Sequence, residues 1–165
     1  MYRYPQAIQA MIHYLGQDRS AVQHALKVVG YAAAIAGGER LEEHDMDVLL
    51  TAAALHDIGI PEALRQYDSA AGPYQEELGP PIARELLQDM GYTHAELEVV
   101  SFLIGHHHSY TLQGDSLLQM LFEADFLVNL EEGSLHNQTP KLIRDRNFHT
   151  PTGIALITSL WGLDE

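Results

Sequence analysis

Apolar residues recur at helical spacing through nearly every segment of this chain, and this periodicity constrains the fold more than any other feature. The clusters of Val, Ile and Thr between turn residues that mark β-strands are missing. The sequence therefore predicts an all-α protein, a compact bundle of about six to eight helices. A chain of 165 residues can bury one core of ordinary size, so we expect a single domain over residues 1–165.

Glycine, proline and capping residues divide the periodic pattern into segments. They predict helices over about 5–15, 20–36, 43–58, 80–90, 93–106, 116–130 and 151–160. Thr93 and Glu96 have the spacing of a capping box at the start of one of these helices. Residues 68–79 are rich in Gly, Pro and polar groups, so we expect a loop there that can fold over a cleft.

Composition limits both the metal chemistry and the partners. The chain contains no cysteine, so disulfides and thiolate metal sites are excluded and any metal must be bound through nitrogen and oxygen. Nine Lys and Arg residues against 23 Asp and Glu residues give a formal net charge of −14, which argues against a nucleic-acid polymer as partner. A small phosphorylated substrate is compatible with this charge, because a bound cation reverses the local field.

The start of the chain lacks the basic residues, apolar run and cleavage site of a secretory signal. No apolar stretch is long enough to span a bilayer without a charged residue or histidine inside it. We therefore expect a cytoplasmic protein with no membrane partner. A homodimer is compatible with the sequence.

The residues most informative about chemistry are His56 and Asp57, at the end of the apolar segment 52–59. The interpretation without function is a helix C-cap pair, with the histidine complementing the helix dipole. A buried carboxylate next to an imidazole is costly unless a positive charge accompanies it, and a divalent cation meets that need. We therefore predict that His56 and Asp57 bind a metal.

Two further polar residues lie in apolar helical surroundings, His24 and Asp125. Taken alone, His24 would be a histidine of the core and Asp125 a solvated residue at a helix edge. Together with His56 and Asp57 they supply two imidazoles and two carboxylates from three helices. This donor set suits Mn, Fe, Co, Ni or Zn, is too rich in nitrogen for calcium, and leaves positions free for water and a phosphoryl oxygen.

The order His24, His56-Asp57, Asp125 resembles the signature of the HD-domain superfamily of metal-dependent phosphohydrolases. The segment 55–61 (Leu-His-Asp-Ile-Gly-Ile-Pro) looks like the HD-Ile-Gly branch of that superfamily. The resemblance extends over about residues 20–130. It implies a helical bundle around one or two metals and the hydrolysis of phosphate esters, often of nucleotides.

Two departures from the family pattern concern the number of metals and the acid–base residue. Two-metal members have a further histidine at the position that we align with Gly79, so we expect one metal per chain, with a second as the alternative. Nucleotidase members carry a catalytic glutamate just after the His-Asp pair, where this chain has Ile60. The candidates for that role here are Glu62, shortly after the pair, and Glu76 or Glu77 in the predicted loop.

Residues 106–108 are three histidines in succession, similar to the His-His element that faces the metal in this family. We assign His106 and His107 to catalysis, either as ligands of a second ion or as hydrogen-bond donors to phosphate oxygens. Lys141 and Arg144 belong to a small basic group that is a candidate clamp for the substrate phosphate; a neutralised surface is the alternative.

The resulting hypothesis is a metal-dependent phosphohydrolase, acting as a phosphomonoesterase or phosphodiesterase on a small phosphorylated metabolite or nucleotide. The metal would activate a water molecule for in-line attack, and Asp57 would orient that water. Two other classes remain as alternatives. One is a di-iron oxygenase of the HD type, which the glycine at position 79 disfavours, and the other is a non-catalytic module that binds a nucleotide or a metal.

Overall fold

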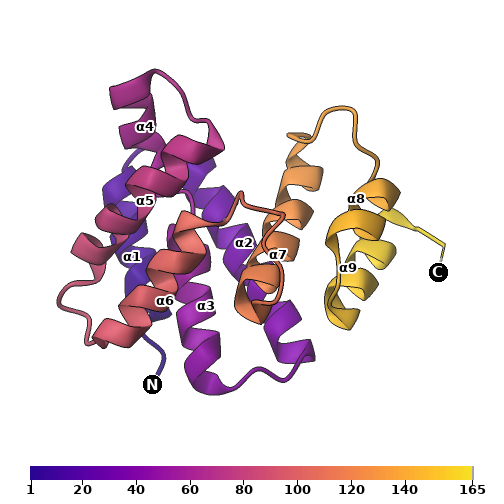
Figure 1. Ribbon diagram of the computed structural model, residues 1–165, viewed down its shortest axis with the longest axis horizontal. Coiled ribbons are helices and arrows are strands. Elements are labelled where there is room, and N and C mark those ends of the chain that lie inside the picture. Colours follow the sequence, from indigo (N-terminus) through magenta and orange to yellow (C-terminus); the bar gives the residue numbers. More distant parts are fainter. Residues whose placement is uncertain (165) are drawn as a thin grey trace.

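The computed structural model describes residues 1–164 and contains only helices and irregular segments in that range (Figure 1). The predicted all-α class is confirmed, with nine helices in the described residues instead of six to eight. The helices are α1 (Tyr4–Leu15), α2 (Arg19–Gly38), α3 (Glu43–Leu55), α4 (Ile60–Tyr67), α5 (Gly72–Leu87), α6 (His94–Gly105), α7 (Ser116–Glu132), α8 (Pro140–Asn147) and α9 (Pro151–Trp161).

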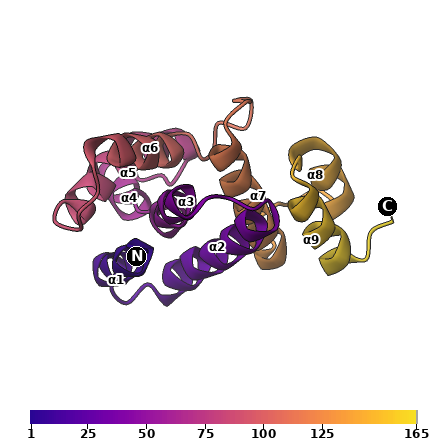
Figure 2. The ribbon, with the colours of Figure 1, turned by 90° about the horizontal axis from the view of Figure 1, so that it is seen from below.

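Helix α3 forms the centre of the core. Every residue from Asp47 to Leu55 is buried, which is the pattern of a helix surrounded by other elements on all sides. Helices α1, α2, α6 and α7 pack against it, and their order around α3 can be followed in Figure 2. The His56-Asp57 pair follows the last turn of α3, so the most enclosed helix of the molecule delivers it.

Helices α2 and α7 lie side by side, with the N-terminal end of α2 beside the C-terminal end of α7. The ion pair between Nζ of Lys27 and Oε1 of Glu131, at 3.1 Å, fixes this antiparallel alignment. It places His24, in the second turn of α2, level with Asp125 in α7.

Helices α4 and α5 cross where two glycines face each other. A Cβ atom on Gly59 would lie 2.8 Å from the backbone nitrogen of Gly79 and 2.9 Å from the carbonyl oxygen of Gln75, which is closer than real Cβ atoms approach. On the other side, a Cβ atom on Gly79 would lie 2.8 Å from a methyl group of Ile104. The position expected for a family histidine is therefore a packing site with no room for a side chain.

The predicted loop over residues 68–79 is wrong for most of its length. Helix α5 already begins at Gly72, and only a short connection separates it from α4, a helix that the sequence analysis did not predict. Pro80 and Pro81, which we expected in the first turn, lie inside α5. They lack the N–H groups that would bond to the carbonyls one turn earlier, and the ring of Pro80 packs near Gly105.

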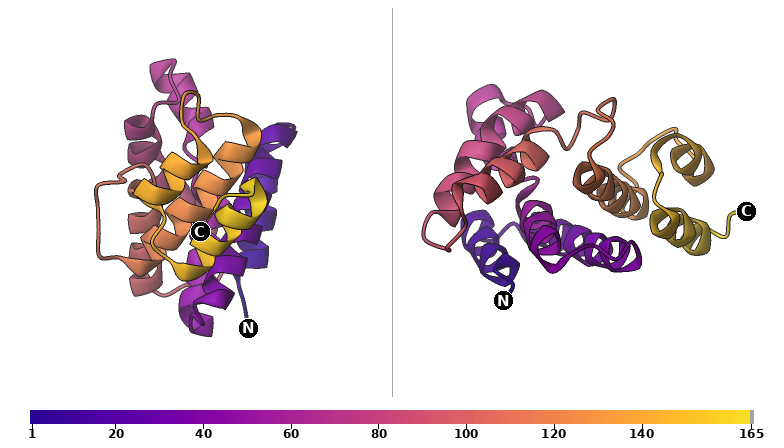
Figure 3. Two further views of the ribbon diagram at one scale, coloured as in Figure 1. Left: turned by 90° about the vertical axis from the view of Figure 1, so that its right-hand side faces the viewer. Right: turned by 60° about the horizontal axis from the view of Figure 1, so that its bottom comes forward.

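Helices α8 and α9 pack on the side of α7 that faces away from α4, α5 and α6 (Figure 3). The buried Glu123 of α7 joins α9 to this surface. Its carboxylate accepts hydrogen bonds from the backbone N–H groups of His149 and Thr150 and from the hydroxyl of Thr150, the N-cap residue of α9. Glu123 is thus a buried acid with a structural role, in contrast to Asp125 two residues later.

Arg3 connects the N-terminal segment to α3 and α6. Its Nε donates to Oδ2 of Asp47 at 2.9 Å, one of its Nη atoms donates to Oε2 of Glu96 at 3.0 Å, and its guanidinium lies over the ring of Tyr92. The hydrogen bond from Arg3 lowers the pKa of Glu96 to about 2. The capping box of Thr93 and Glu96, predicted from the sequence, is present in the same region.

None of the helices in the part of the chain that the structure describes combines the length and the hydropathy needed to cross a membrane.

Candidate metal centre

Three side chains predicted to bind a metal meet at the N-terminal half of α2 and the end of α3. His24, His56 and Asp57 each present a ligand atom, and these atoms lie within 4.8 Å of one another. Nε2 of His24 is 3.2 Å from Nε2 of His56, and Oδ2 of Asp57 is 3.3 Å from both nitrogens. The structure thus brings together three of the residues that the sequence predicts as metal ligands.

Asp125 completes the group from α7. Its Oδ1 is 3.2 Å from Nε2 of His24 and 3.4 Å from Nε2 of His56. Ligand atoms about 2.1 Å from one ion, at angles between tetrahedral and octahedral, are about 3.0–3.4 Å apart. The distances among His24, His56 and Asp57, and those from Asp125 to the two histidines, fall in this range, which suits a small cation held by the two imidazoles and a carboxylate.

The tautomers of both histidines point to a cation as well. Nδ1–H of His24 donates to Oε2 of Glu132 at 2.9 Å, and Nδ1–H of His56 donates to the carbonyl oxygen of Ala53 at 2.8 Å. In the neutral rings both Nε2 atoms then carry a lone pair, and these atoms face each other and two carboxylates. Acceptors in such contact need a shared proton or a metal ion between them.

The pKa shifts express the same need for positive charge. Burial lowers the pKa of His24 and His56, but the neighbouring carboxylates of Asp57 and Asp125 outweigh it, so both pKa values are raised. Burial would raise the pKa of the two aspartates, yet the histidines beside them hold it well below its ordinary range. The two aspartates therefore stay ionised, and their negative charge attracts either protons on the neighbouring histidines or a metal ion.

A second group of ligand atoms adjoins the first and shares Asp57. It consists of Asp57, His107 and His108, whose ligand atoms again lie within 4.8 Å of one another. Oδ1 of Asp57, the oxygen not directed at His24, is 3.3 Å from Nε2 of His107. Nδ1–H of His107 donates to the carbonyl oxygen of Ile104 at 2.6 Å, so its Nε2 lone pair also points toward the carboxylate.

Gln75 of α5 lies where the missing family histidine was expected to act. Its Oε1 is 3.3 Å from Nε2 of His107 and 3.1 Å from Nε2 of His108, and its side chain is buried. Sequence reasoning missed this residue because it looked for a side chain at Gly79, one helical turn further on. No sequence signal singles out Gln75, because it stands in a polar segment rich in Gly and Pro, and only the structure shows that its side chain is buried.

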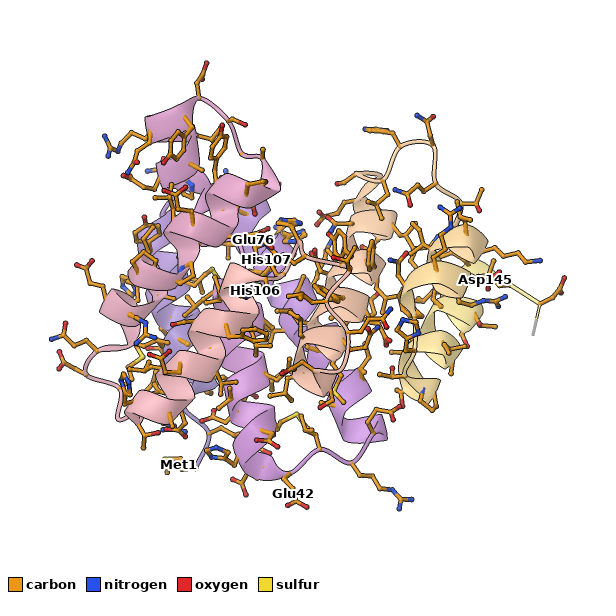
Figure 4. All side chains as sticks on the ribbon, viewed as in Figure 1. Met1, Glu42, Glu76, His106, His107 and Asp145 are labelled. Atoms are coloured by element: carbon orange, nitrogen blue, oxygen red, sulfur yellow. The ribbon has the colours of Figure 1, made fainter. Side chains whose placement is uncertain are left out.

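The register of the histidine run differs from the prediction. The ring of His106 folds back along α6, where Nδ1–H donates to the carbonyl of Phe102 and the two rings lie 4.5 Å apart. The structure therefore does not bring His106 to the other site residues. His107 and His108 face the centre instead, because α6 ends at Gly105 and the chain turns there. The side chain of His107 is buried beside Glu76 in Figure 4.

Burial, and next the neighbouring His107, lower the pKa of His108 to about 4. At neutral pH this ring is therefore uncharged, and its Nε2 is available to a metal or to a hydrogen bond.

The three glutamates considered for acid–base catalysis have other partners. Glu62 pairs with Arg65 and Gln66 on the surface of α4, and Glu77 accepts a hydrogen bond from Tyr67. Oε1 of Glu76 accepts from the backbone N–H of His108 and from the hydroxyl of Ser109, at 2.9 Å each, so Glu76 holds the histidine run in place. The structure does not bring any of the three into the lining of the cleft.

Lys141 and Arg144, the predicted phosphate clamp, are also remote from the metal-binding groups. Both lie in α8, on the outer side of α7, and Arg144 donates to Asp145, to the hydroxyl of Thr158 and to the carbonyl of Asp164. Figure 4 shows the neighbouring Asp145 toward the right-hand edge of the molecule, whereas His107 lies near the centre. The clamp prediction is wrong in its geometry, because α7 stands between α8 and the cleft.

The cleft over the two groups has a volume of about 370 Å³, at the small end of the range for ligand sites. Its lining comprises Asp18, Ser20, Ala21, His24, Asp57, Ile60, Gln75, His108, Asp125, Asn129, Glu132 and Ser134. The inner wall consists of the metal-binding groups, and the mouth consists of hydroxyl, amide and carboxylate side chains. A larger cavity of about 560 Å³ between α8 and α9 contains none of the predicted metal ligands.

The fold and the site together define a helical protein with histidine and aspartate ligands at the meeting point of α2, α3 and α7. The HD domain family matches residues 21–130, more than half of the sequence, and the chain belongs to this family. The structure resembles the crystal structure of a predicted HD superfamily hydrolase from an uncultured Thermotogales bacterium, with a TM-score of 0.71 and 20% sequence identity. The likeness covers 96% of this chain and 84% of that one. A comparison with curated proteins found no match.

Proposed function

We propose that this protein is a metal-dependent phosphohydrolase that acts on a small phosphorylated metabolite or nucleotide. The observation that carries the proposal is the convergence of His24, His56, Asp57 and Asp125, whose acceptor atoms face one another at 3.2–3.4 Å beside a cleft. The structure that shares the fold is described as a predicted hydrolase, which is compatible with this proposal. A divalent cation at this point lowers the pKa of bound water and offsets charge on a phosphoryl oxygen.

The residues of the chain have separate tasks in this proposal. His24, His56, Asp57 and Asp125 hold the cation, which is Mn, Fe, Co, Ni or Zn according to the donor set. The carboxylate of Asp57 reaches both groups, so it would also orient the attacking water. The carboxylate of Glu132 accepts the Nδ1–H of His24, and this hydrogen bond keeps Nε2 of His24 directed toward the cation site.

A second cation belongs to the proposal as well. Asp57, Gln75, His107 and His108 offer two oxygens and two nitrogens at separations of 3.1–3.3 Å. The sequence leaves the histidine run between metal binding and hydrogen bonding to phosphate, and Gly79 in place of a family histidine favours hydrogen bonding. The oxygen of Gln75 provides a ligand from the same helix, which favours metal binding by His107 and His108.

A phosphate-release screen over nucleotides and sugar phosphates, with each divalent metal restored after chelation, tests the function. The wild-type protein is expected to release phosphate from at least one ester only when a metal is present. Asp57→Ala is expected to lose bound metal and about 100-fold or more of the activity together. The control is Asp89→Ala, which removes an exposed aspartate in the connection after α5.

Metal-dependent turnover that survives in Asp57→Ala would contradict the assignment. Two irons per chain with oxygen uptake would instead support an oxygenase, and nucleotide binding without phosphate release would support a non-catalytic module. Oxygen uptake without phosphate release separates the oxygenase from the hydrolase, and elemental analysis of the protein as isolated gives the metal and its number per chain.

A further inference from the structure

The mouth of the cleft is formed by two helix ends. The first turn of α2 contributes Asp18 and Ser20, and the last turn of α7 with the residue after its cap contributes Asn129, Glu132 and Ser134. These side chains surround the space in front of the metal-binding groups. They are the groups that the part of a substrate beyond its reacting phosphate would meet.

The electrostatic character of this mouth is negative. The N-terminal end of a helix ordinarily attracts anions, but the α2 terminus is capped by the carboxylate of Asp18, whose Oδ1 accepts from the backbone N–H of Ala21 at 3.0 Å. The C-terminal end of α7 adds partial negative charge of its own, and Glu132 adds a full one. Both helix ends therefore disfavour an anion at the mouth.

Basic side chains are absent from the lining of the described cleft. Lys27 is outside the lining, and its ammonium group pairs with Glu131 at 3.1 Å and with Glu132 at 3.7 Å. Arg19, which lies between Asp18 and Ser20 in the sequence, is exposed and is also outside the lining. A second phosphate or a carboxylate on the substrate would thus find hydroxyls, an amide and two carboxylates, and no cation to pair with.

From this arrangement we infer that the cleft selects phosphate monoesters whose alcohol portion carries no negative charge, and that it prefers one with an ammonium group. The inference rests on the proposed phosphohydrolase function. The metal-binding groups receive the phosphoryl group, while Ser20, Asn129 and Ser134 hydrogen-bond to hydroxyl groups of the alcohol portion. Asp18 and Glu132 attract an ammonium group and repel carboxylates and further phosphates. Nucleoside triphosphates and phosphorylated acids are excluded by charge.

Three substrates of similar size test this selection: phosphoethanolamine, glycerol 3-phosphate and 3-phosphoglycerate. Their alcohol portions are positive, neutral and negative. For the metal-loaded full chain, kcat/KM is expected to fall in that order, with at least about a tenfold difference between the first and the last. Raising the salt to about 1 M, where the Debye length is about 3 Å, is expected to narrow the difference.

Asp18→Asn isolates the charge at the mouth, because asparagine is as good an N-cap as aspartate. It is expected to raise kcat/KM for 3-phosphoglycerate roughly three- to tenfold relative to phosphoethanolamine, mainly through KM. Asp18→Ser, which also preserves a cap, should shift the ratio in the same direction. The matched control is Asp115→Asn at the N-cap of α7, the opposite end of that helix, and it should leave the ratio unchanged.

A failure of the inference and a failure of the proposed function give different results. Equal or faster hydrolysis of 3-phosphoglycerate, or equal ratios in the Asp18 and Asp115 variants, would overturn the inference and leave the phosphohydrolase function standing. Absence of phosphate release from every ester under every metal would remove the proposed function, and the inference with it.

Discussion

At the scale of single residues, the site depends on how each imidazole is oriented. His24 and His56 both direct Nε2 inward because Nδ1–H is held elsewhere, by Glu132 and by the carbonyl of Ala53. A hydrogen-bonded partner behind a metal-binding histidine fixes its ring and raises its basicity. Glu132 is therefore a positioning residue for the proposed cation, and it was not among the residues singled out in the sequence.

Glu132→Gln is expected to weaken metal binding about 10- to 100-fold, because the amide accepts the N–H of His24 less strongly than the carboxylate does. The measurement is the dissociation constant for Mn²⁺ by titration calorimetry of the metal-free protein. Glu131→Gln is the matched control, since Glu131 pairs with Lys27 and makes no contact with His24. Equal affinities of the two variants would show that Glu132 does not position the ring.

At the scale of elements, the crossing of α4 and α5 decides which side chain of α5 reaches the site. Gly59 and Gly79 let the two backbones touch, and this contact turns Gln75 toward the histidine run. The sequence suggested a loop here because Gly72, Pro73 and Gly79 are typical of loops. Tertiary packing overrode that preference, and the resulting helix brings Gln75 to His107 and His108.

Gly59→Ala is expected to lower the free energy of unfolding by about 1–3 kcal/mol, because the new methyl group would meet only backbone atoms of α5. Urea denaturation of the metal-free protein measures this change. Gly30→Ala, in an exposed helical position where a Cβ meets nothing within 4 Å, is the control and should raise stability by about 0.5–1 kcal/mol. A Gly59→Ala protein as stable as the wild type would refute the close crossing.

At the scale of the whole molecule, the sequence predicts the helical class and the candidate ligands that lie in apolar helices or directly after one. His24, His56 and Asp125 are recognisable because a polar side chain in an apolar helical stretch needs a partner. The orientation of His106, His107 and His108 was not predictable in this way, since they follow the end of α6. There the direction of the chain depends on a hydrogen bond from the backbone of His108 to Glu76, which is distant in sequence.

Lys141 and Arg144 are a second case in which the sequence alone does not reveal where side chains lie. Charge and spacing alone suggest a phosphate clamp, but they do not reveal that α7 lies between α8 and the cleft. In the same way, Asp125 and Glu123 are both buried acids of α7, and only the packing of α9 shows that Glu123 serves as a cap.

The most direct test is anomalous diffraction at the manganese edge from crystals of the protein grown with Mn²⁺. The account predicts a peak among Nε2 of His24, Nε2 of His56 and the carboxylates of Asp57 and Asp125, within bonding distance of all four. Manganese bound only elsewhere, with these four side chains paired to one another or turned apart, would contradict it.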